Sequence, residues 1–188
     1  MARVDATTSI FLVGPMGAGK SAVGRKLAEE LGREFIDSDE VIESRTGVDI
    51  PYIFEREGET GFRARERQVI DELTRRPGIV LATGGGAVQD PANREHLGSR
   101  GRVVYLHASV DQQLKRTRGG RERPMLRGGD PREILEALMA VRDPQYREIA
   151  DFTVETDGRR VAAVTREICR RLSDLAQPGA DPAPIITR

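Results

Sequence analysis

The stretch GPMGAGKS (14–21) places glycines, a lysine and a serine at the spacing G-x-x-x-x-G-K-[ST]. Glycines at such positions can adopt positive φ, so that backbone amides converge on a phosphate. The lysine can reach the β- and γ-phosphates, and the serine hydroxyl can ligate Mg²⁺. The stretch therefore predicts a loop that binds ATP with Mg²⁺, rather than a glycine-rich turn without a ligand. The residues expected to contact the nucleotide are Gly17, Ala18, Gly19, Lys20, Ser21 and Ala22.

Acidic side chains follow the short apolar segment EFID (34–37). Phosphate loops of this kind usually take a second Mg²⁺ contact from an aspartate at the end of another strand, but GIVLAT (78–83) ends without one. Asp37 and Asp39 stand at the carboxyl end of 34–37, and alternation would put both on one side if the strand continues that far. One carboxylate could then support Mg²⁺ and the other accept a substrate proton. The alternative is that they cap the next helix.

Three consecutive glycines, 84–86, follow the segment 78–83. Such a run increases the conformational entropy that the chain loses on folding. It is useful where a ligand must touch backbone amides, although a plain loop is the alternative.

Apolar segments and helical patterns alternate through the chain, which indicates a parallel sheet covered on both faces. The predicted fold is α/β: a three-layer sandwich with a five-stranded parallel sheet, the phosphate loop at its edge and helices on both faces. Ligands bind at the carboxyl ends of the strands in such sheets. We expect strands at 9–13, 34–37, 78–83, 102–108 and 151–156, and helices at 20–31, 39–46, 50–57, 59–75, 91–99, 109–118, from 131 onward and at 160–175.

The segments outside this pattern are rich in glycine and proline. Residues 119–130, GGRERPMLRGGD, cannot form a core element, and we expect them to be a mobile lid. The end of the chain, 177–188, is rich in proline and alanine, and we expect it to be disordered. Residues 1–176 are therefore predicted to form a single domain.

Composition excludes several other classes of protein. The 30 basic and 30 acidic residues give a formal net charge of zero, which argues against bulk binding of nucleic acid. No apolar run approaches the roughly 18 residues that a membrane span needs. The one cysteine, Cys169, lies on an apolar helical pattern, so it is a packing residue rather than a reactive thiol, and the absence of a possible disulfide fits a reducing cytoplasm. We expect a cytoplasmic monomer that acts on a small molecule.

Beyond the phosphate loop, six motifs give the chain a family resemblance. They are GPMGAGKSAVGRKLA, FIDSDEVIESRTG, IFEREGETGFRARE, VLATGGGAV, RERPML and VRDPQYREIAD. On these motifs the chain resembles the shikimate kinases from about Ser9 to Leu172. The resemblance implies ATP-dependent phosphorylation of the 3-hydroxyl of shikimate, a step toward chorismate and the aromatic amino acids.

The resemblance also implies roles for individual residues. Asp39 corresponds to the catalytic base that contacts the shikimate hydroxyls, and Asp37 to the acid near Mg²⁺. Planar arginine forks hold a carboxylate well, which suits the proposed substrate. The remaining assignments are Arg63 and Arg142 for the shikimate carboxylate, Gly84, Gly85 and Gly86 facing the substrate, Arg123 in the lid over the phosphates, and Arg116 and Arg160 on the adenine side.

A lysine in a motif is stronger evidence of a functional role in this chain than an arginine is. The chain has 27 arginines and three lysines, so an arginine is a surface residue unless its motif indicates otherwise. Two positions depart from the family pattern, Met125 and Gln145, where the family usually has leucine.

Two alternative functions remain: a related small-molecule kinase, such as one acting on gluconate, and a regulator that binds nucleotide or shikimate without catalysis. Such a regulator would be expected to lack Lys20, Asp39 or Arg123.

Overall fold

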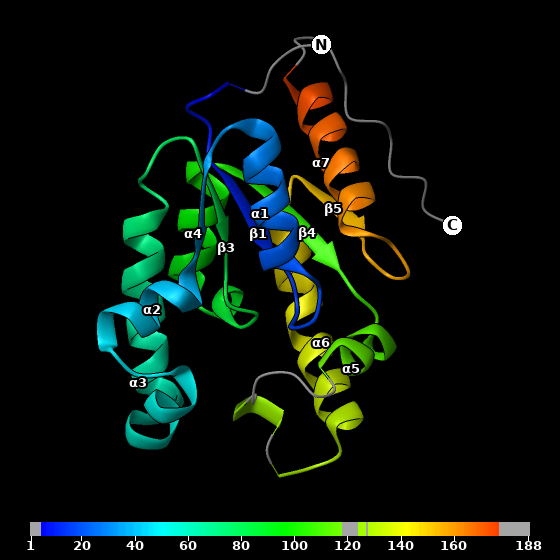
Figure 1. Cartoon of the computed structure of the whole chain (residues 1–188). Helices are drawn as coiled ribbons and strands as arrows, with labels where there is room; N and C mark the ends of the chain where they lie inside the picture. Colours follow the sequence, from blue (N-terminus) through cyan, green and yellow to red (C-terminus); the bar gives the residue numbers. More distant parts are fainter. Residues whose placement is uncertain (1–4, 118–123, 127, 177–188) are drawn as a thin grey trace.

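The computed structural model describes residues 5–117, 124–126 and 128–176. Five strands form one parallel sheet in the order β2-β3-β1-β4-β5 (Figure 1). The strands are β1 (Ile10–Val13), β2 (Glu34–Asp37), β3 (Ile79–Ala82), β4 (Arg102–His107) and β5 (Phe152–Glu155). The helices are α1 (Lys20–Leu31), α2 (Ser38–Thr46), α3 (Ile50–Leu73), α4 (Pro91–Arg100), α5 (Val110–Thr117), α6 (Pro131–Ile149) and α7 (Val161–Leu175), with short 3₁₀ turns η1 (Ala87–Gln89) and η2 (Pro124–Leu126).

The sheet is covered on both faces, which confirms the predicted three-layer α/β fold. Side chains of α1 and α7 pack with one face of the sheet, and Figure 1 shows these two helices side by side. Side chains of α2, α3, α4 and α6 pack with the other face. Because both faces are covered, the central strands are apolar throughout and not alternating.

The strand β1 shows how the two cores are separated. All four of its side chains are fully buried. Phe11 and Val13 point into the core under α2, α3 and α4, whereas Ile10 and Leu12 point into the core under α1 and α7. Any polar substitution in β1 would therefore leave an unsatisfied polar group in one of the two cores.

The chain direction makes the carboxyl end of β1 the place for a ligand. β1 lies between β3 and β4. From β1 the chain goes to β2 at one edge, returns to β3 beside β1, and then crosses to β4 and β5 on the other side. In open α/β sheets the crevice at such a switch point is where ligands bind. The loop 14–19 leaves β1 at this point and leads directly into α1.

Two local features differ from or refine the predicted elements. β2 ends at Asp37 and α2 begins at Ser38, so the alternation that was expected to align Asp37 with Asp39 does not extend that far. The segment 50–73 is one helical run interrupted at Gly58, whose φ of 71° is not helical. The predicted division into helices 50–57 and 59–75 is confirmed at this glycine, because a left-handed φ favours glycine.

The described residues contain no helix long and apolar enough to cross a membrane. Half of the predicted lid at 119–130, including Arg123, and the whole predicted disordered end at 177–188 lie outside the described residues. Cys169 packs against the core under α1 and α7, as expected, and burial raises the pKa of its thiol to about 11.

Gly101, which links α4 to β4, tests how closely the chain packs against β1 and the residue before it. A Cβ at this position would lie 2.6 Å from a ring carbon of Phe11 and 2.7 Å from the carbonyl oxygen of Ser9. We expect Gly101→Ala to lower the free energy of unfolding by about 1–3 kcal/mol, because a well-packed core resists an added methyl group. Urea unfolding measures this.

The matched control is Gly98→Ala, in helix α4, which ends directly before Gly101. There an added Cβ would have its nearest neighbour 4.0 Å away. Removing a glycine from a helix should raise stability by about 0.5–1 kcal/mol. Equal stabilities for the two variants would contradict the close packing described at Gly101.

Candidate active site

The phosphate loop has the backbone geometry that its sequence predicts. Gly14, Gly17 and Gly19 have φ angles of 144°, 75° and 88°, in the region that side chains rarely allow. Gly14 is restricted further, because a Cβ there would lie 2.3 Å from the carbonyl oxygen of Leu106 in β4. The loop is therefore fixed against the sheet by close backbone contact.

Lys20 is the first residue of α1, and its ammonium group contacts the backbone of the phosphate loop. Its Nζ donates to the carbonyl oxygens of Gly14 and Pro15, each at 2.8 Å. Within α1, all of which is described, no side chain caps the N-terminus and no acidic residue stands in the first turn. The amide groups at this helix end can therefore bind an anion, and the helix dipole favours a negative charge there.

Ser21 and Asp37 meet at the same edge of the sheet. The Ser21 hydroxyl donates to Oδ2 of Asp37 at 2.6 Å. The other carboxylate oxygen, Oδ1, accepts from the amide of Asp39 at 3.0 Å and caps α2. Asp37 therefore does both things that the sequence left open: it caps a helix and lies beside the phosphate loop. A hydroxyl and a carboxylate in contact form the kind of all-oxygen donor set that Mg²⁺ prefers, so these residues fit that ion.

A cavity of about 200 Å³ lies over this loop. Its lining includes the predicted residues Gly17, Gly19, Lys20, Ser21, Ala22 and Asp37, together with Met16, Asp39, Thr83 and Gly85. Ala18 does not line it, because its side chain is buried in the core under α1 and α7.

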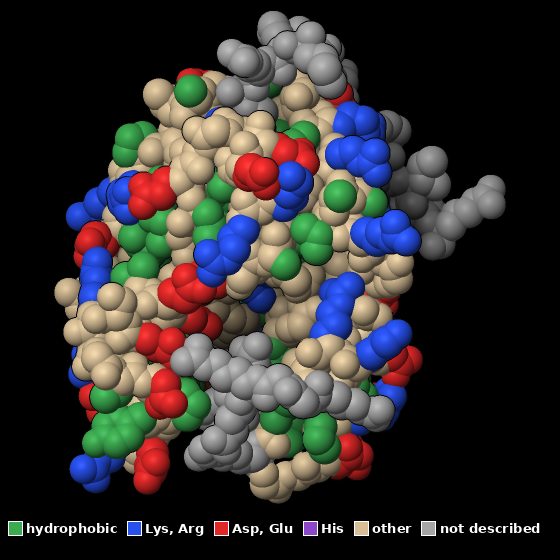
Figure 2. Space-filling model, in the orientation of Figure 1, with side chains coloured by type: hydrophobic (Ala, Val, Ile, Leu, Met, Phe, Trp, Pro, Cys, Tyr) green, Lys and Arg blue, Asp and Glu red, His purple; other side chains and the backbone are tan. Residues whose placement is uncertain are grey.

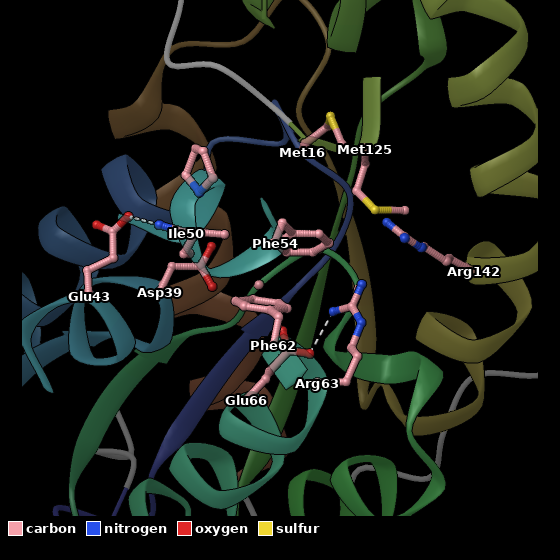
Figure 3. A pocket seen from close by; sticks show the side chains of 14 residues that line it. Met16, Asp39, Glu43, Ile50, Phe54, Phe62, Arg63, Glu66, Met125 and Arg142 are labelled. Carbon is pink, nitrogen blue, oxygen red and sulfur yellow. Dashed lines mark hydrogen bonds and ion pairs between the residues drawn. The ribbon is translucent and has the colours of Figure 1, made fainter. Parts of the chain in front are cut away.

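A second cavity, of about 110 Å³, shares lining residues with the first. Figure 3 shows the side chains that line it, and Figure 2 shows a hollow in this face of the molecule with acidic side chains beside it. Met16, Asp39 and Gly85 line both cavities, so Asp39 lies in the wall that they share. Apolar rings of Phe54 and Phe62 form part of the second cavity. Its polar lining includes Asp39, Glu43, Arg63, Glu66 and Arg142, and Met125 of η2 closes part of the rim.

Arg63 is held in this second cavity by carboxylates of its own helix. It donates to Oε2 of Glu66 at 2.6 Å and to Oε1 of Glu59 at 3.0 and 3.2 Å. Burial opposes the positive charge, but the two carboxylates outweigh it, and the pKa of Arg63 is raised. Arg63 therefore stays charged and points in a fixed direction.

Glu66 is a buried carboxylate in the wall of the second cavity. Its side chain is 1% exposed, and its Oε1 has no hydrogen-bond partner. Burial raises the pKa of Glu66, and the neighbouring Arg63 opposes that shift. Sequence reasoning did not select Glu66, although its place three residues after Arg63 on a helical pattern was a possible signal.

Arg142 comes from α6 and reaches the same cavity from the other side. It is 3% exposed, and burial lowers its pKa. Its guanidinium donates to the side-chain oxygen of Gln89 at 3.0 Å. Figure 3 shows Arg142 and Arg63 across the cavity from Asp39. The structure therefore brings together three of the residues predicted to bind the substrate.

The three glycines 84–86 make room for these charged groups. A Cβ on Gly86 would lie 2.2 Å from a guanidinium nitrogen of Arg63. One on Gly84 would lie 2.6 Å from Glu66 Oε1 and 2.8 Å from Asp39 Oδ1. The glycines were expected to expose backbone amides to a ligand. In the structure the amide of Gly84 donates to the hydroxyl of Ser38 at 3.0 Å. The run allows charged side chains to pack directly against the backbone, which sequence reasoning did not foresee.

The residues predicted on the adenine side are placed differently from one another. Arg116 donates to the carbonyl oxygen of Gly17 at 2.8 Å and to that of Thr156 at 2.8 Å, so it lies beside the phosphate loop. Arg160 is exposed at the start of α7 and lines neither cavity. Arg123 lies outside the described residues.

Known proteins resemble this chain over most of its length. A family model described as "Shikimate kinase" matches residues 16–173. A protein named shikimate kinase from Halorhodospira halophila is 61% identical over 172 residues, which cover 92% of this chain and 97% of the relative. The chain belongs to the shikimate kinase family.

Solved structures agree with this family. The structure of shikimate kinase from Acinetobacter baumannii in complex with shikimate has a TM-score of 0.87 and 51% identity, covering 89% of this chain and 94% of that one. Shikimate kinase from Aquifex aeolicus has a TM-score of 0.78 and 34% identity over 89% of this chain and 98% of that one. A gluconokinase from Sinorhizobium meliloti has a TM-score of 0.58 and 20% identity, over 91% of this chain and 94% of that one, and shows a shared fold alone.

Gly86 tests whether the glycine run sets the position of Arg63. We expect Gly86→Ala to push the guanidinium out of its present place, because the new methyl would overlap it. The displaced atoms belong to a flexible side chain, so the fold should persist. Binding of shikimate, the ligand in the Acinetobacter structure, should weaken by about tenfold, the scale of one charge-assisted hydrogen bond.

Calorimetric titration with shikimate measures this loss. Gly98→Ala is the control, because position 98 lines neither cavity. A Gly86→Ala protein that binds shikimate as tightly as this control would contradict the proposed fit between the glycine run and Arg63.

Proposed function

We propose that this shikimate kinase family member transfers the γ-phosphoryl group of ATP to the 3-hydroxyl of shikimate, a step toward chorismate and the aromatic amino acids. The observation that carries the proposal is the wall shared by the two cavities. Asp39 lines both the cavity over the phosphate loop and the cavity that contains Arg63 and Arg142. A group in that wall can act on a hydroxyl in one cavity and a phosphate in the other.

The phosphate side of the site supplies positive charge. Lys20, the loop amides and the N-terminus of α1 would bind the phosphate oxygens, and Arg116 would lie near the adenine side. Phosphoryl transfer depends on positioning and on charge stabilisation of this kind. Ser21 and Asp37 would hold Mg²⁺, which when bound neutralises negative charge on the phosphates. Arg123 and Arg160 remain predictions as further nucleotide contacts.

The acceptor side would hold the substrate by its carboxylate. Arg63 and Arg142 lie across the cavity from Asp39 (Figure 3). A carboxylate bound by these two guanidinium groups would direct the ring hydroxyls toward Asp39. Asp39 would accept the proton of the 3-hydroxyl. The hydroxyl oxygen of the substrate would then bond to the γ-phosphorus as ADP departs.

Two alternative functions are less well supported. Gluconate is also a carboxylate, but the gluconokinase neighbour supports only the fold, and the acceptor cavity combines two aromatic rings with a pair of arginines. A non-catalytic regulator would not need the lysine at position 20 or the aspartate in the shared wall. We further propose that residues 1–176 form a single domain with a lid at 119–130, and that the protein is a cytoplasmic monomer.

A coupled assay of ADP release tests the substrate directly. We expect ATP turnover to require shikimate, with gluconate giving no more than the rate without an acceptor. Lys20→Ala should lower kcat about a hundredfold or more, because it removes charge from the transferring phosphoryl group. Turnover with gluconate, or turnover that does not depend on an acceptor, would contradict the proposed function.

Asp39→Asn tests the proposed base. The change keeps the shape of the side chain but removes the proton acceptor and the charge. We expect kcat to fall at least a hundredfold, the range for a lost general base, whereas ATP affinity stays almost unchanged. Kinetics and calorimetric ATP binding are measured together. If ATP affinity is lost and kcat survives, Asp39 belongs to the nucleotide site instead.

A further inference from the structure

A neutral side chain joins the two arginines of the acceptor cavity. Gln89 is the last residue of η1, the short turn that follows the glycine run. Its Oε1 accepts a hydrogen bond from Arg142 at 3.0 Å and a longer one from Arg63 at 3.4 Å. Arg142, in α6, is separated from Gln89 by 53 positions in the chain, and Arg63, in α3, by 26 positions.

The two guanidinium groups need such an acceptor for electrostatic reasons. Both are positive, and both are removed from water, with side-chain exposure of 19% for Arg63 and residue exposure of 3% for Arg142. Like charges repel more strongly when they are out of water. Arg63 is compensated by Glu59 and Glu66. Arg142 has no salt bridge within the described residues, and its Nε is buried without a hydrogen-bond partner. Its hydrogen bond to Gln89 turns it toward Arg63.

Gln89 is itself held in a rigid place. Its backbone N–H donates to the carbonyl oxygen of Gly86 at 3.0 Å. Asn93, which is fully buried, donates to the carbonyl oxygen of Ala87 at 2.9 Å. Arg94 donates to the carbonyl oxygen of Val88 at 2.7 Å. Because neighbouring side chains donate to the carbonyl groups of η1, the backbone of this turn is fixed. The side-chain amide of Gln89 is therefore attached to a fixed backbone.

The chemistry of an amide suits this position better than that of a carboxylate. An amide oxygen accepts hydrogen bonds from both guanidinium groups and leaves their combined positive charge available. A carboxylate there would cancel part of that charge and repel an anionic ligand. An aliphatic side chain would leave the donor of Arg142 without an acceptor.

We propose that Gln89 is a positioning residue, which holds Arg63 and Arg142 as one preorganised binding site for the carboxylate of the substrate. The proposal rests on the proposed function, in which that carboxylate belongs to shikimate. It assigns Gln89 no direct contact with substrate, and Gln89 is not among the residues that line the cavity.

Two substitutions at Gln89 separate positioning from simple packing. Gln89→Ala should weaken shikimate binding and raise its KM about three- to tenfold, the effect of losing one or two ordinary hydrogen bonds. Gln89→Glu keeps the shape of the side chain but should weaken binding further, because the added charge competes with the substrate carboxylate. For both variants, kcat and the KM for ATP should stay within about twofold of the unchanged protein.

Calorimetric shikimate binding and steady-state kinetics measure these effects, with Gln68→Ala as the control at an exposed glutamine of α3. In a double-mutant cycle, Gln89→Ala should have much less effect when Arg142 is already alanine. Near-normal binding in both Gln89 variants, or tighter binding in Gln89→Glu, would overturn the proposal. If the unchanged protein fails to phosphorylate shikimate, the proposed function itself is wrong, which is a separate result.

Discussion

Burial of β1 on both faces is the constraint on which the rest of the structure depends. The strand has no side chain exposed to water, so helices must cover both sides of the sheet. With β3 on one side and β4 on the other, its carboxyl end opens into a crevice and not onto a flat edge. The phosphate loop and α1 follow from that point, and the carbonyl group of Leu106 in β4 leaves no space for a side chain at Gly14.

Much of this fold could be predicted from the sequence, because the signals are local. Each strand is a short apolar run, and glycine or an N-capping aspartate marks many of the helix ends. Gly58 marked the break in the long helix 50–73 for the same reason. The prediction that Asp37 and Asp39 lie on one side of a continuing strand was wrong, and the reason is also local. The alternation argument assumed that the strand continued, whereas the same aspartate ended it by capping α2.

The candidate site was predicted in part, and what was missed depends on burial and on contacts between distant residues. The phosphate loop is a continuous motif, so its residues could be named directly. Gln89 carries no motif, and it matters because Arg142 and Arg63 approach it from α6 and α3. Glu66 lies only three residues after Arg63, but spacing alone does not show that its carboxylate is buried in the cavity wall. The glycine run was recognised as unusual, but the side chains that need its space come from α2 and α3 and could not be identified from spacing.

The shared wall between the cavities also has a consequence for inhibitor design. Where the two cavities meet, the wall is formed by Met16, Asp39 and Gly85, and one of these three residues has no side chain. A bisubstrate compound that joins a phosphate mimic to a ring carboxylate would cross this wall beside Gly85, where the linker meets backbone and the flexible thioether of Met16. The linker would need to be short and to tolerate the negative charge of Asp39. Compounds that compete with ATP alone would meet a loop geometry common to many nucleotide-binding proteins, whereas a linked compound would also have to fit the arginine pair.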